Sequence, residues 1–370
     1  MTLRLRPPRV IPTQQGFILA DPYGVFQEPV VVGEGGLHLF RLMQGRTLEE
    51  LQSELLKQGV LLPKEELENF LRALEGAGLL LTEGVEARLR EAEAELQRGR
   101  PVRLAGVSYP KAPEDARAFI RAFRASYAGE GRRADVVVMP HLEPARVPEV
   151  YGATLASLEV TPPPERIYLL GVAHQPLQEA AAALPVPFET PFGPAEPDLA
   201  ALQALDALLP FELFNTPLAF REEHSLELPL FFLKASYPAA RVLPLLIGER
   251  SPGLGEALKV LLPDYPGLVV LAVDLSHVGP RFGDRPLDPA LAEEARGRDV
   301  GFLEGLIRGE APLALERLGH NPTRVDAVEV VATALPLLQG YRGELLSYRL
   351  DLEAATLSAV GAGTVVLHRP

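Results

Sequence analysis

From residue 101 onward, short apolar runs alternate with helical stretches. Helical patterns at 113–127 and 196–208 separate runs that are typical of strands, at 102–107, 135–139, 166–171, 241–247 and 268–273. The run at 135–139 is continuously apolar, as expected for a strand that is covered on both faces. This alternation predicts an α/β domain over 101–370, with a mixed sheet flanked by helices. Two further strands are predicted at 344–350 and 359–367, and we expect them to be antiparallel at an edge of the sheet.

Composition excludes several classes of protein. The chain has 370 residues, no cysteine and a formal net charge of −13. Disulfides, zinc ribbons, iron–sulfur clusters and a cysteine nucleophile are therefore excluded. The acidic balance argues against a general nucleic-acid binder. No apolar run approaches the roughly 20 residues of a membrane helix and no signal peptide is evident, so we expect a cytoplasmic protein.

The arginine content indicates a heat-adapted or GC-rich source. Of 36 basic residues only five are lysines, which leaves 31 arginines, and prolines are numerous while methionines are few. Such a composition is typical of thermophile proteins, although genomic base bias alone could give it.

The first 85 residues predict a separate small domain. Apolar runs at 16–20 and 25–32 flank a turn, and a closing strand is predicted at 79–82. Thr47 and Glu50 form a capping box at the start of one of three predicted helices, which cover 36–43, 47–58 and 63–76. This arrangement is winged-helix-like. Residues 86–100 are highly charged and predict a linker helix between the two domains.

Polar side chains follow three of the predicted strands where each strand ends. His141 follows the run at 135–139, His174 follows the next, and Asp274 and His277 follow the last. Ligands of open α/β sheets bind at the carboxyl ends of the strands, so these positions predict a site. His224 begins a further helix together with two glutamates. Two interpretations of those carboxylates are open: they serve the site, or they simply favour the helix dipole.

The residue types at this edge favour a metal site. The chain has no P-loop, no GxGxxG after a strand and no GxSxG elbow. Neutral imidazoles that converge with carboxylates suit Fe(II), Zn or Mn. The alternative is metal-free acid–base chemistry by His277 with Asp274.

Ordered motifs in both parts of the chain resemble known families. The second part carries PHLEPARVPEVYGATLASL (140–158), LLGVAH (169–174), FETPFG (188–193), EEHSLELPLFFL (222–233) and VDLSHVGPRFGD (273–284). These resemble the Memo-like family, and more narrowly protein B of the AmmeMemoRadiSam system. The first part carries GFILADPYG (16–24), LMQGRTLEELQSEL (42–55) and FLRALEGAGLLL (70–81), which resemble the PqqD-like domain. The Memo fold is similar to that of class III extradiol dioxygenases, which cleave catechol rings with non-haem iron.

The Memo resemblance implies roles for particular residues. His141 and His174 match the two ligand histidines, and His277 matches the acid–base histidine, with Asp274 expected to orient it. His224 matches a histidine that borders the pocket. Aligning the stretch at 321–338 puts Asp326 where relatives carry a cysteine ligand, so Asp326 is either the third ligand or the cap of the helix that begins near 327. Another difference is Glu143, where many relatives have aspartate.

The expected function follows from this resemblance. We expect a metal-binding protein, with Fe(II) as the first choice and copper or zinc as alternatives, that acts as a redox or dioxygenase-type enzyme. The alternative is a non-catalytic scaffold with a degenerate metal site. Expected partners are the radical SAM and AMMECR-type proteins of the same system and a peptide at the N-terminal domain, with no nucleic acid or membrane involved.

Overall fold

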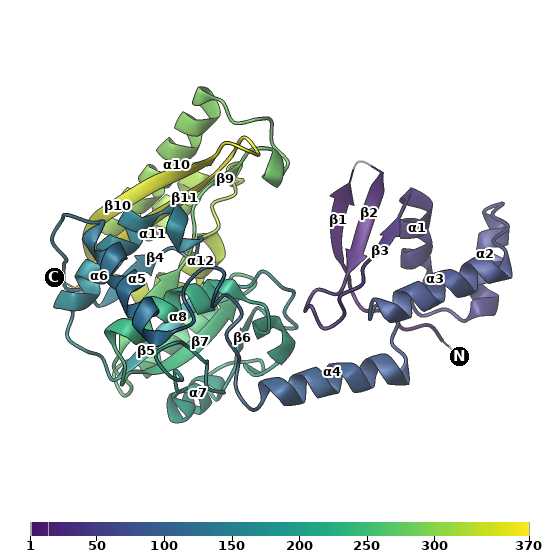
Figure 1. Cartoon of the computed structure of the whole chain (residues 1–370), viewed down its shortest axis with the longest axis horizontal. Helices are drawn as coiled ribbons and strands as arrows, with labels where there is room; N and C mark the ends of the chain where they lie inside the picture. The colour runs from purple at the N-terminus through teal and green to yellow at the C-terminus, as the bar shows by residue number, and fades with distance from the viewer. Residues whose placement is uncertain (1, 14, 370) are drawn as a thin grey trace. The chain divides into compact units, whose positions relative to one another are not determined.

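The computed structural model describes residues 2–13 and 15–369, which form two compact units, 1–98 and 99–370 (Figure 1). Among the described residues, no helix is both long enough and apolar enough to cross a membrane.

The N-terminal unit combines a small antiparallel sheet with helices. Its strands lie in chain order and are β1 (Arg9–Thr13), β2 (Gly16–Ala20) and β3 (Val30–Val32). Its helices are α1 (Glu34–Met43), α2 (Leu48–Lys57), α3 (Lys64–Gly76) and α4 (Glu83–Leu96). The predicted capping box begins α2: Thr47 accepts a hydrogen bond from the amide of Glu50, and Glu50 accepts one from the amide of Thr47.

The predicted boundaries differ from these elements in places. The run at 25–32 pairs only over β3, and the expected closing strand at 79–82 is reduced to a single bridge between Leu80 and Leu5. The predicted linker helix over 86–100 overlaps α4, and its linker role stays a prediction. The likeness of residues 1–85 to PqqD-like domains also stays a prediction.

Residues 99–369 form the mixed α/β fold that the sequence predicts. An eight-stranded sheet has the order β10-β11-β4-β8-β5-β7-β6, with β9 paired to β11. The strands β4, β8, β5 and β7 run parallel, whereas β6, β11 and β10 are antiparallel to their neighbours. Their bounds are β4 (Val136–Met139), β5 (Arg166–Val172), β6 (Ala181–Ala183), β7 (Arg241–Ile247), β8 (Leu268–Ala272), β9 (His277–Val278), β10 (Arg342–Glu353) and β11 (Ser358–His368). The two C-terminal strands lie at one edge, as expected.

Helices cover both faces of this sheet (Figure 1). One face shares a single apolar core with α7 (Leu199–Asp206), α9 (Pro252–Leu261), α10 (Pro289–Ile307), α11 (Ala311–Leu318) and α12 (Val328–Leu338). The other face packs against α6 (Pro148–Val160) and α8 (His224–Ser236), with α5 (Pro113–Ala125) lying on these two helices. Short 3-10 helices occur at Pro144–Arg146, Pro217–Phe220 and Pro280–Phe282. Burial on both faces explains why the central strands are continuously apolar.

The strand predicted at 102–107 is wrong, because this segment forms turns. The carboxylate of Glu227 accepts hydrogen bonds from the amides of Arg103, at 2.9 Å, and Leu104, at 2.8 Å. Gly106 has a φ of +84°, which is outside the strand region. A buried side chain thus satisfies the amides that a neighbouring strand would otherwise have bonded, and the local apolar pattern does not reveal this acceptor.

Candidate metal centre

Three neighbouring parallel strands end at one edge of the sheet. β8 lies between β4 and β5. His141 follows β4, His174 follows β5, and Asp274 follows β8. The topology therefore brings together side chains that are up to 133 positions apart in the sequence, at the edge where α/β sheets bind ligands.

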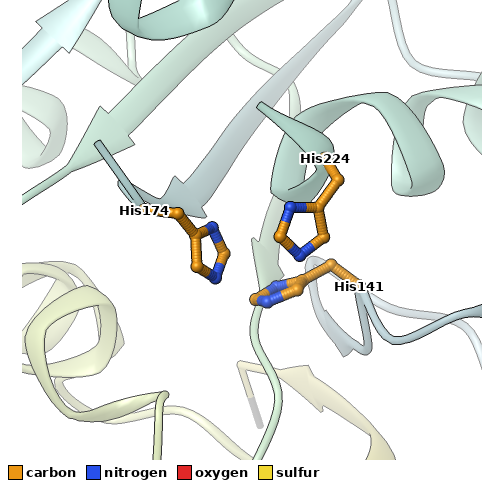
Figure 2. A group of neighbouring side chains, drawn as sticks. All are labelled: His141, His174 and His224. Atoms are coloured by element: carbon orange, nitrogen blue, oxygen red, sulfur yellow. The ribbon is translucent and has the colours of Figure 1, made fainter. Parts of the chain in front are cut away.

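His224 joins His141 and His174 in one cluster (Figure 2). Each imidazole offers one ring nitrogen, and the three nitrogens all lie within 4.8 Å of one another. The ring centroid of His174 is 4.2 Å from that of His224 and 5.2 Å from that of His141. The sequence places His224 at the border of the pocket, whereas the structure places it inside the cluster. Three converging imidazoles are a donor set that binds Fe, Zn or Cu.

The beginning of α8 is fixed to the end of β5 by two side chains. Glu223 accepts hydrogen bonds from the Nδ1–H of His174, at 2.8 Å, and from its amide, at 2.9 Å. Ser225 donates its hydroxyl to the carbonyl of Val172, at 2.7 Å. Gly171 permits this close approach, since a Cβ there would lie 2.7 Å from the Ser225 hydroxyl oxygen. These contacts place the imidazole of His174 with its Nε2 free.

Glu223 has a second role as the N-cap of α8. Its carboxylate accepts a hydrogen bond from the amide of Ser225, at 2.9 Å, and lies 3.6 Å from the Nδ1 of His224. Both interpretations of this glutamate therefore hold, because one carboxylate caps the helix and also orients a histidine of the cluster.

Backbone groups and Asp274 hold His141 on the other side of the cluster. The Nδ1 of His141 lies 3.1 Å from the carbonyl oxygen of Ala272, so Nδ1–H donates and Nε2 faces the cluster. Asp274 accepts hydrogen bonds from the amides of His141, at 3.0 Å, and Leu142, at 3.1 Å. Its other oxygen lies 3.6 Å from the Nε2 of His141. Both side chains are almost fully buried.

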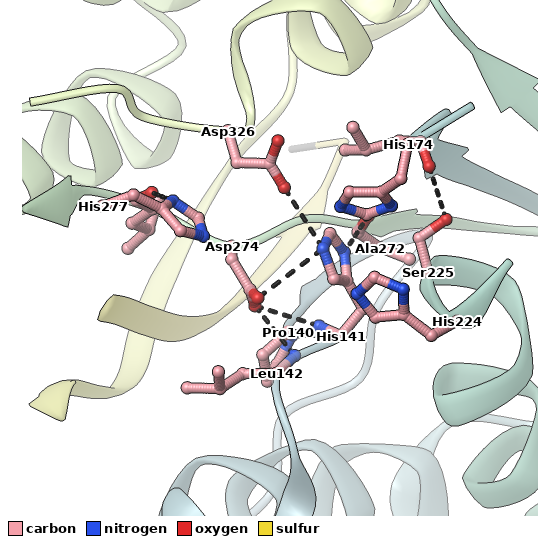
Figure 3. A network of polar contacts seen from close by, with 12 residues as sticks. Pro140, His141, Leu142, His174, His224, Ser225, Ala272, Asp274, His277 and Asp326 are labelled. Atoms are coloured by element: carbon pink, nitrogen blue, oxygen red, sulfur yellow. Dashed lines mark hydrogen bonds and ion pairs between the residues drawn. The ribbon is translucent and has the colours of Figure 1, made fainter. Parts of the chain in front are cut away.

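Asp326 presents an unbonded oxygen to the cluster (Figure 3). Its Oδ2 lies 3.1 Å from the Nε2 of His141, yet it is buried and has no hydrogen-bond partner among the described residues. The alternative role of helix cap does not fit, because α12 begins at Val328 after Ala327 and no side chain caps its first turn. While the Nε2 of His141 is unprotonated, this buried oxygen has no donor, which is costly, and either a proton on that ring or a bound cation would satisfy it.

His277 faces the same cavity across Asp274 and Asp326 (Figure 3). The expectation that Asp274 orients His277 is wrong, since the Nδ1 of His277 lies 2.8 Å from the carbonyl oxygen of Leu275 and the carboxylate of Asp274 bonds the His141 segment instead. The backbone therefore fixes the ring of His277 and leaves its Nε2 free. Phe282 packs edge-on against this ring, with centroids 4.9 Å apart.

A cavity of about 280 Å³ lies over the four histidines. Its rim carries Arg146 and Arg281, which are paired with carboxylates of β10 at 2.6 Å and 2.7 Å, respectively. Ser108 donates a hydrogen bond to Glu143 at 2.5 Å on another wall. The cavity has room for a small molecule beside the cluster.

The two sides of the cluster have opposite electrostatics. Burial lowers the pKa of His141, but the charges of Asp274 and Asp326 outweigh burial and raise it to about 10. Burial lowers the pKa of His224 to about 3, and the neighbouring imidazoles act in the same direction. Burial raises the pKa of Glu223, but hydrogen bonds and the charge of His174 bring it down to about 2. His224 and Glu223 are therefore ready to act as a neutral ligand and as an anion, respectively, at neutral pH.

A buried ion pair supports the helix that carries His224. Arg100 is 1% exposed and is paired with Glu227 on α8. Its guanidinium also donates to the carbonyls of Phe220, at 3.1 Å, and Glu223, at 2.9 Å. Tyr109 donates its hydroxyl to Glu227 at 2.6 Å. No motif indicated Arg100 or Tyr109, because their role depends on contacts between positions that are more than a hundred residues apart.

The cluster fits a divalent transition metal. Three imidazoles and the unbonded oxygen of Asp326 are nitrogen and oxygen donors, and the chain has no thiolate. Such donors suit Fe(II), Zn or Mn. His141, His174, His224 and Asp326 are the residues that could hold the ion.

Comparison with known proteins shows the family of this chain. The family model described as "Memo-like protein" matches residues 100–366. A MEMO1 family protein of Thermus thermophilus is 73% identical over 326 residues, which cover 88% of this chain and all of that protein. A MEMO1 family protein of Aquifex aeolicus is 30% identical over 365 residues, covering 95% of this chain and 96% of its own length.

The fold and the histidine cluster define a mixed α/β protein with a candidate metal centre at the carboxyl edge of its sheet. By its sequence, the chain belongs to the Memo-like protein family. The match to the Aquifex protein extends beyond the range of the family model, so it includes most of the N-terminal unit.

Proposed function

We propose that this chain is a non-haem metal-dependent redox enzyme with Fe(II) at the histidine cluster. The observation that supports it most directly is the buried Oδ2 of Asp326, which lies 3.1 Å from the Nε2 of His141 and has no other hydrogen-bond donor among the described residues. Two neutral ligands and one carboxylate, with other positions left open, are typical of non-haem iron sites. When bound, Fe(II) supplies one-electron and oxygen chemistry.

The chain's own residues would divide the work between holding the ion and moving protons. His141, His174 and Asp326 are the proposed ligands, and we propose His224 as a further ligand because its ring nitrogen lies within 4.8 Å of those of His141 and His174. Glu223 fixes His174 through its Nδ1–H. His277 would exchange a proton with the substrate at its free Nε2, because its Nδ1 is engaged by the backbone.

The direct test is metal analysis of protein purified without a His-tag and loaded anaerobically with Fe(II), Cu(II) or Zn(II) in competition. We expect one tightly bound ion per chain, and we expect the His141→Ala and His174→Ala double variant to lose it. An unchanged metal content in the double variant would exclude the centre. Metal that binds normally, with no oxygen consumption when catechol is added as a probe, would instead favour the non-catalytic scaffold.

We further propose that the chain works with the radical SAM and AMMECR-type proteins of the AmmeMemoRadiSam system in the cytoplasm of a heat-adapted organism. Family membership supports this proposal, since it rests on the Memo-like resemblance and on composition. The N-terminal unit would hold a peptide or one of these partners. Co-expression of the full chain with the radical SAM protein of the same genome tests it, and a complex that survives deletion of residues 1–98 would contradict the role of that unit.

A further inference from the structure

A second hollow lies away from the histidine cluster, between α5, α6 and α8. Two adjoining cavities of about 450 Å³ and 280 Å³ share Ile120, Arg121 and Ala235 in their walls. The three helices lie side by side on one face of the sheet (Figure 1). We call these two cavities the α5–α8 groove. At about 450 Å³, its larger part alone exceeds the cavity over the histidines and falls in the range of small-molecule sites.

The floor of the α5–α8 groove is apolar. Leu155 and Leu158 of α6 line its larger cavity together with Tyr237, and all three are buried. Tyr237 donates its hydroxyl to the carbonyl of Leu158, at 2.7 Å, so that its ring edge is fixed in the wall. Phe192 supplies an aromatic wall to the smaller cavity. These surfaces can pack against the apolar part of a ligand, such as one alkyl chain or one ring.

Positive charge gathers at this groove although the chain as a whole has a net charge of −13. The lining includes four cations, of which three lie on one face of α5, and a single carboxylate: Arg117, Arg121, Arg124, Lys234 and Glu159. That carboxylate is already paired with Arg124, at 2.7 Å. Arg117 lies over the ring of Phe192. In the described part of the chain, Arg121 has no ion pair or hydrogen bond.

Lys234 distinguishes this groove from an ordinary solvated helix face. Lys234 is only 8% exposed, yet it has no ion pair within the described residues, and the negative charge of Glu196 acts on it only from beyond ion-pair distance. Its Nζ donates to the carbonyl of Pro238, at 2.6 Å, which leaves donors free on the ammonium. A buried ammonium with no paired carboxylate is costly, and an anionic ligand in the groove would compensate it.

We propose that the α5–α8 groove binds a small amphipathic anion. Its carboxylate or phosphate group contacts Lys234 and Arg121, and its apolar body lies along Leu155, Leu158 and Tyr237. Guanidinium groups recognise both anions by charge-assisted hydrogen bonds. The site is separate from the histidine cluster, although α8 carries His224 at one end and Lys234 at the other.

The test uses the fluorescent anion 1-anilinonaphthalene-8-sulfonate as a probe of the full-length chain. We expect one probe molecule to bind per chain, and we expect decanoate or decyl phosphate to displace it. The anion that binds more tightly of these two identifies the headgroup that the site prefers. Decanol, which lacks the charge, should displace it at least tenfold more weakly. Absence of probe binding, or equal displacement by decanol, would overturn the proposal.

Substitutions in the α5–α8 groove test whether the probe binds there. Arg121→Ala and Lys234→Met should each lower the affinity for the probe and for the displacing anion at least tenfold. The matched control is Arg317→Ala, which removes an exposed arginine with no ion pair among the described residues from a helix on the other face. Wild-type affinity in the first two variants, or equal weakening in the control, would contradict the site. Arg121 is exposed, so its variant decides the question even if Lys234→Met does not fold.

Discussion

Glu223 and Asp326 are carboxylates on opposite sides of the histidine cluster, and they are bonded very differently. Glu223 accepts hydrogen bonds from the ring and amide of His174 and from the amide of Ser225. Asp326 approaches only the ring of His141, and its Oδ2 has no hydrogen-bond partner in the described chain. On the side of Glu223, the hydrogen bonds of the carboxylate are therefore made within the protein. On the side of Asp326, one carboxylate oxygen still lacks such partners.

This difference separates a residue that positions ligands from a residue that can be one. A carboxylate whose two oxygens both accept hydrogen bonds from the protein fixes the orientation of the histidine that it contacts. A carboxylate oxygen that is buried without a donor keeps its capacity for a cation, and this costs free energy in the metal-free protein. The comparison leads to predictions that differ for the two sides.

The largest effect is expected from Glu223→Gln. The amide offers one acceptor oxygen where the carboxylate has two, so at least one buried N–H loses its partner. We expect the Fe(II) affinity to fall about 100-fold, which is the upper range for residues that orient ligands. We expect the unfolding free energy of the metal-free protein to fall by about 1–3 kcal/mol.

Equilibrium metal titration and denaturant unfolding measure these two effects. The control is Glu222→Gln at the neighbouring position, whose side chain is 39% exposed and pairs with Arg221. A Glu223→Gln variant that loses affinity but keeps its unfolding free energy would mean that the carboxylate binds the ion itself, and the comparison would fail.

A smaller effect is expected from Asp326→Asn. The amide oxygen remains a weak donor atom and the three imidazoles stay in place, so the Fe(II) affinity should fall about tenfold. The unfolding free energy should change less than in Glu223→Gln, because no amide loses an acceptor. Glu329→Gln, in the first turn of the helix that follows Asp326, is the control. Unchanged affinity would exclude Asp326 as a ligand.

Part of this asymmetry could be predicted from the sequence. Continuous apolar runs located β4, β5 and β8, and the strand ends placed His141, His174 and Asp274 at one edge. This works because parallel strands that are buried on both faces have a simple pattern, and because their carboxyl ends lie together. The same strand ends place His277 at this edge, and His224 lies at the start of a predicted helix with two glutamates, whereas Asp326 comes only from the resemblance to a family.

The rest depends on contacts between distant segments. The place of His224 in the cluster follows from the bond between Ser225 and Val172, and no local pattern shows it. A carboxylate just before a helix can be a cap or a ligand, so the sequence alone does not distinguish these two roles of Asp326. The position at which α12 begins excludes the cap. The spacing of Asp274 and His277 suggested a pair, but the turn after β8 directs the carboxylate to the His141 segment.

The number of protons released when Fe(II) binds should distinguish the two sides of the cluster, because His141 and His224 have very different pKa values. The carboxylates beside His141 outweigh its burial and raise its pKa to about 10, so at pH 8 this ring is protonated in the metal-free protein. Burial lowers the pKa of His224 to about 3, so that ring is already neutral. Binding of Fe(II) at pH 8 should therefore release about one proton, and the number should approach zero above pH 10.

Calorimetric titration in buffers with different ionisation enthalpies counts these protons. Asp326→Asn should lower the pKa of His141 and reduce the number released at pH 8, whereas Glu329→Gln should not. If no proton is released by the wild-type chain at pH 8, His141 is neutral before binding, and the electrostatic difference between the two sides does not exist.

The smallest effect on metal affinity is expected from His277→Gln. This ring lines the cavity, but the histidine nitrogens that lie within 4.8 Å of one another belong to three other residues, and its own Nδ1 contacts the backbone. The Fe(II) affinity should change less than about threefold, as for a residue outside the ligand set. Oxygen consumption with catechol should nevertheless fall by about 100-fold if His277 is the acid–base, with His320→Gln as an exposed control. A loss of affinity as large as that of Asp326→Asn would instead make His277 a ligand, and the open side of the cluster would then have two incomplete positions.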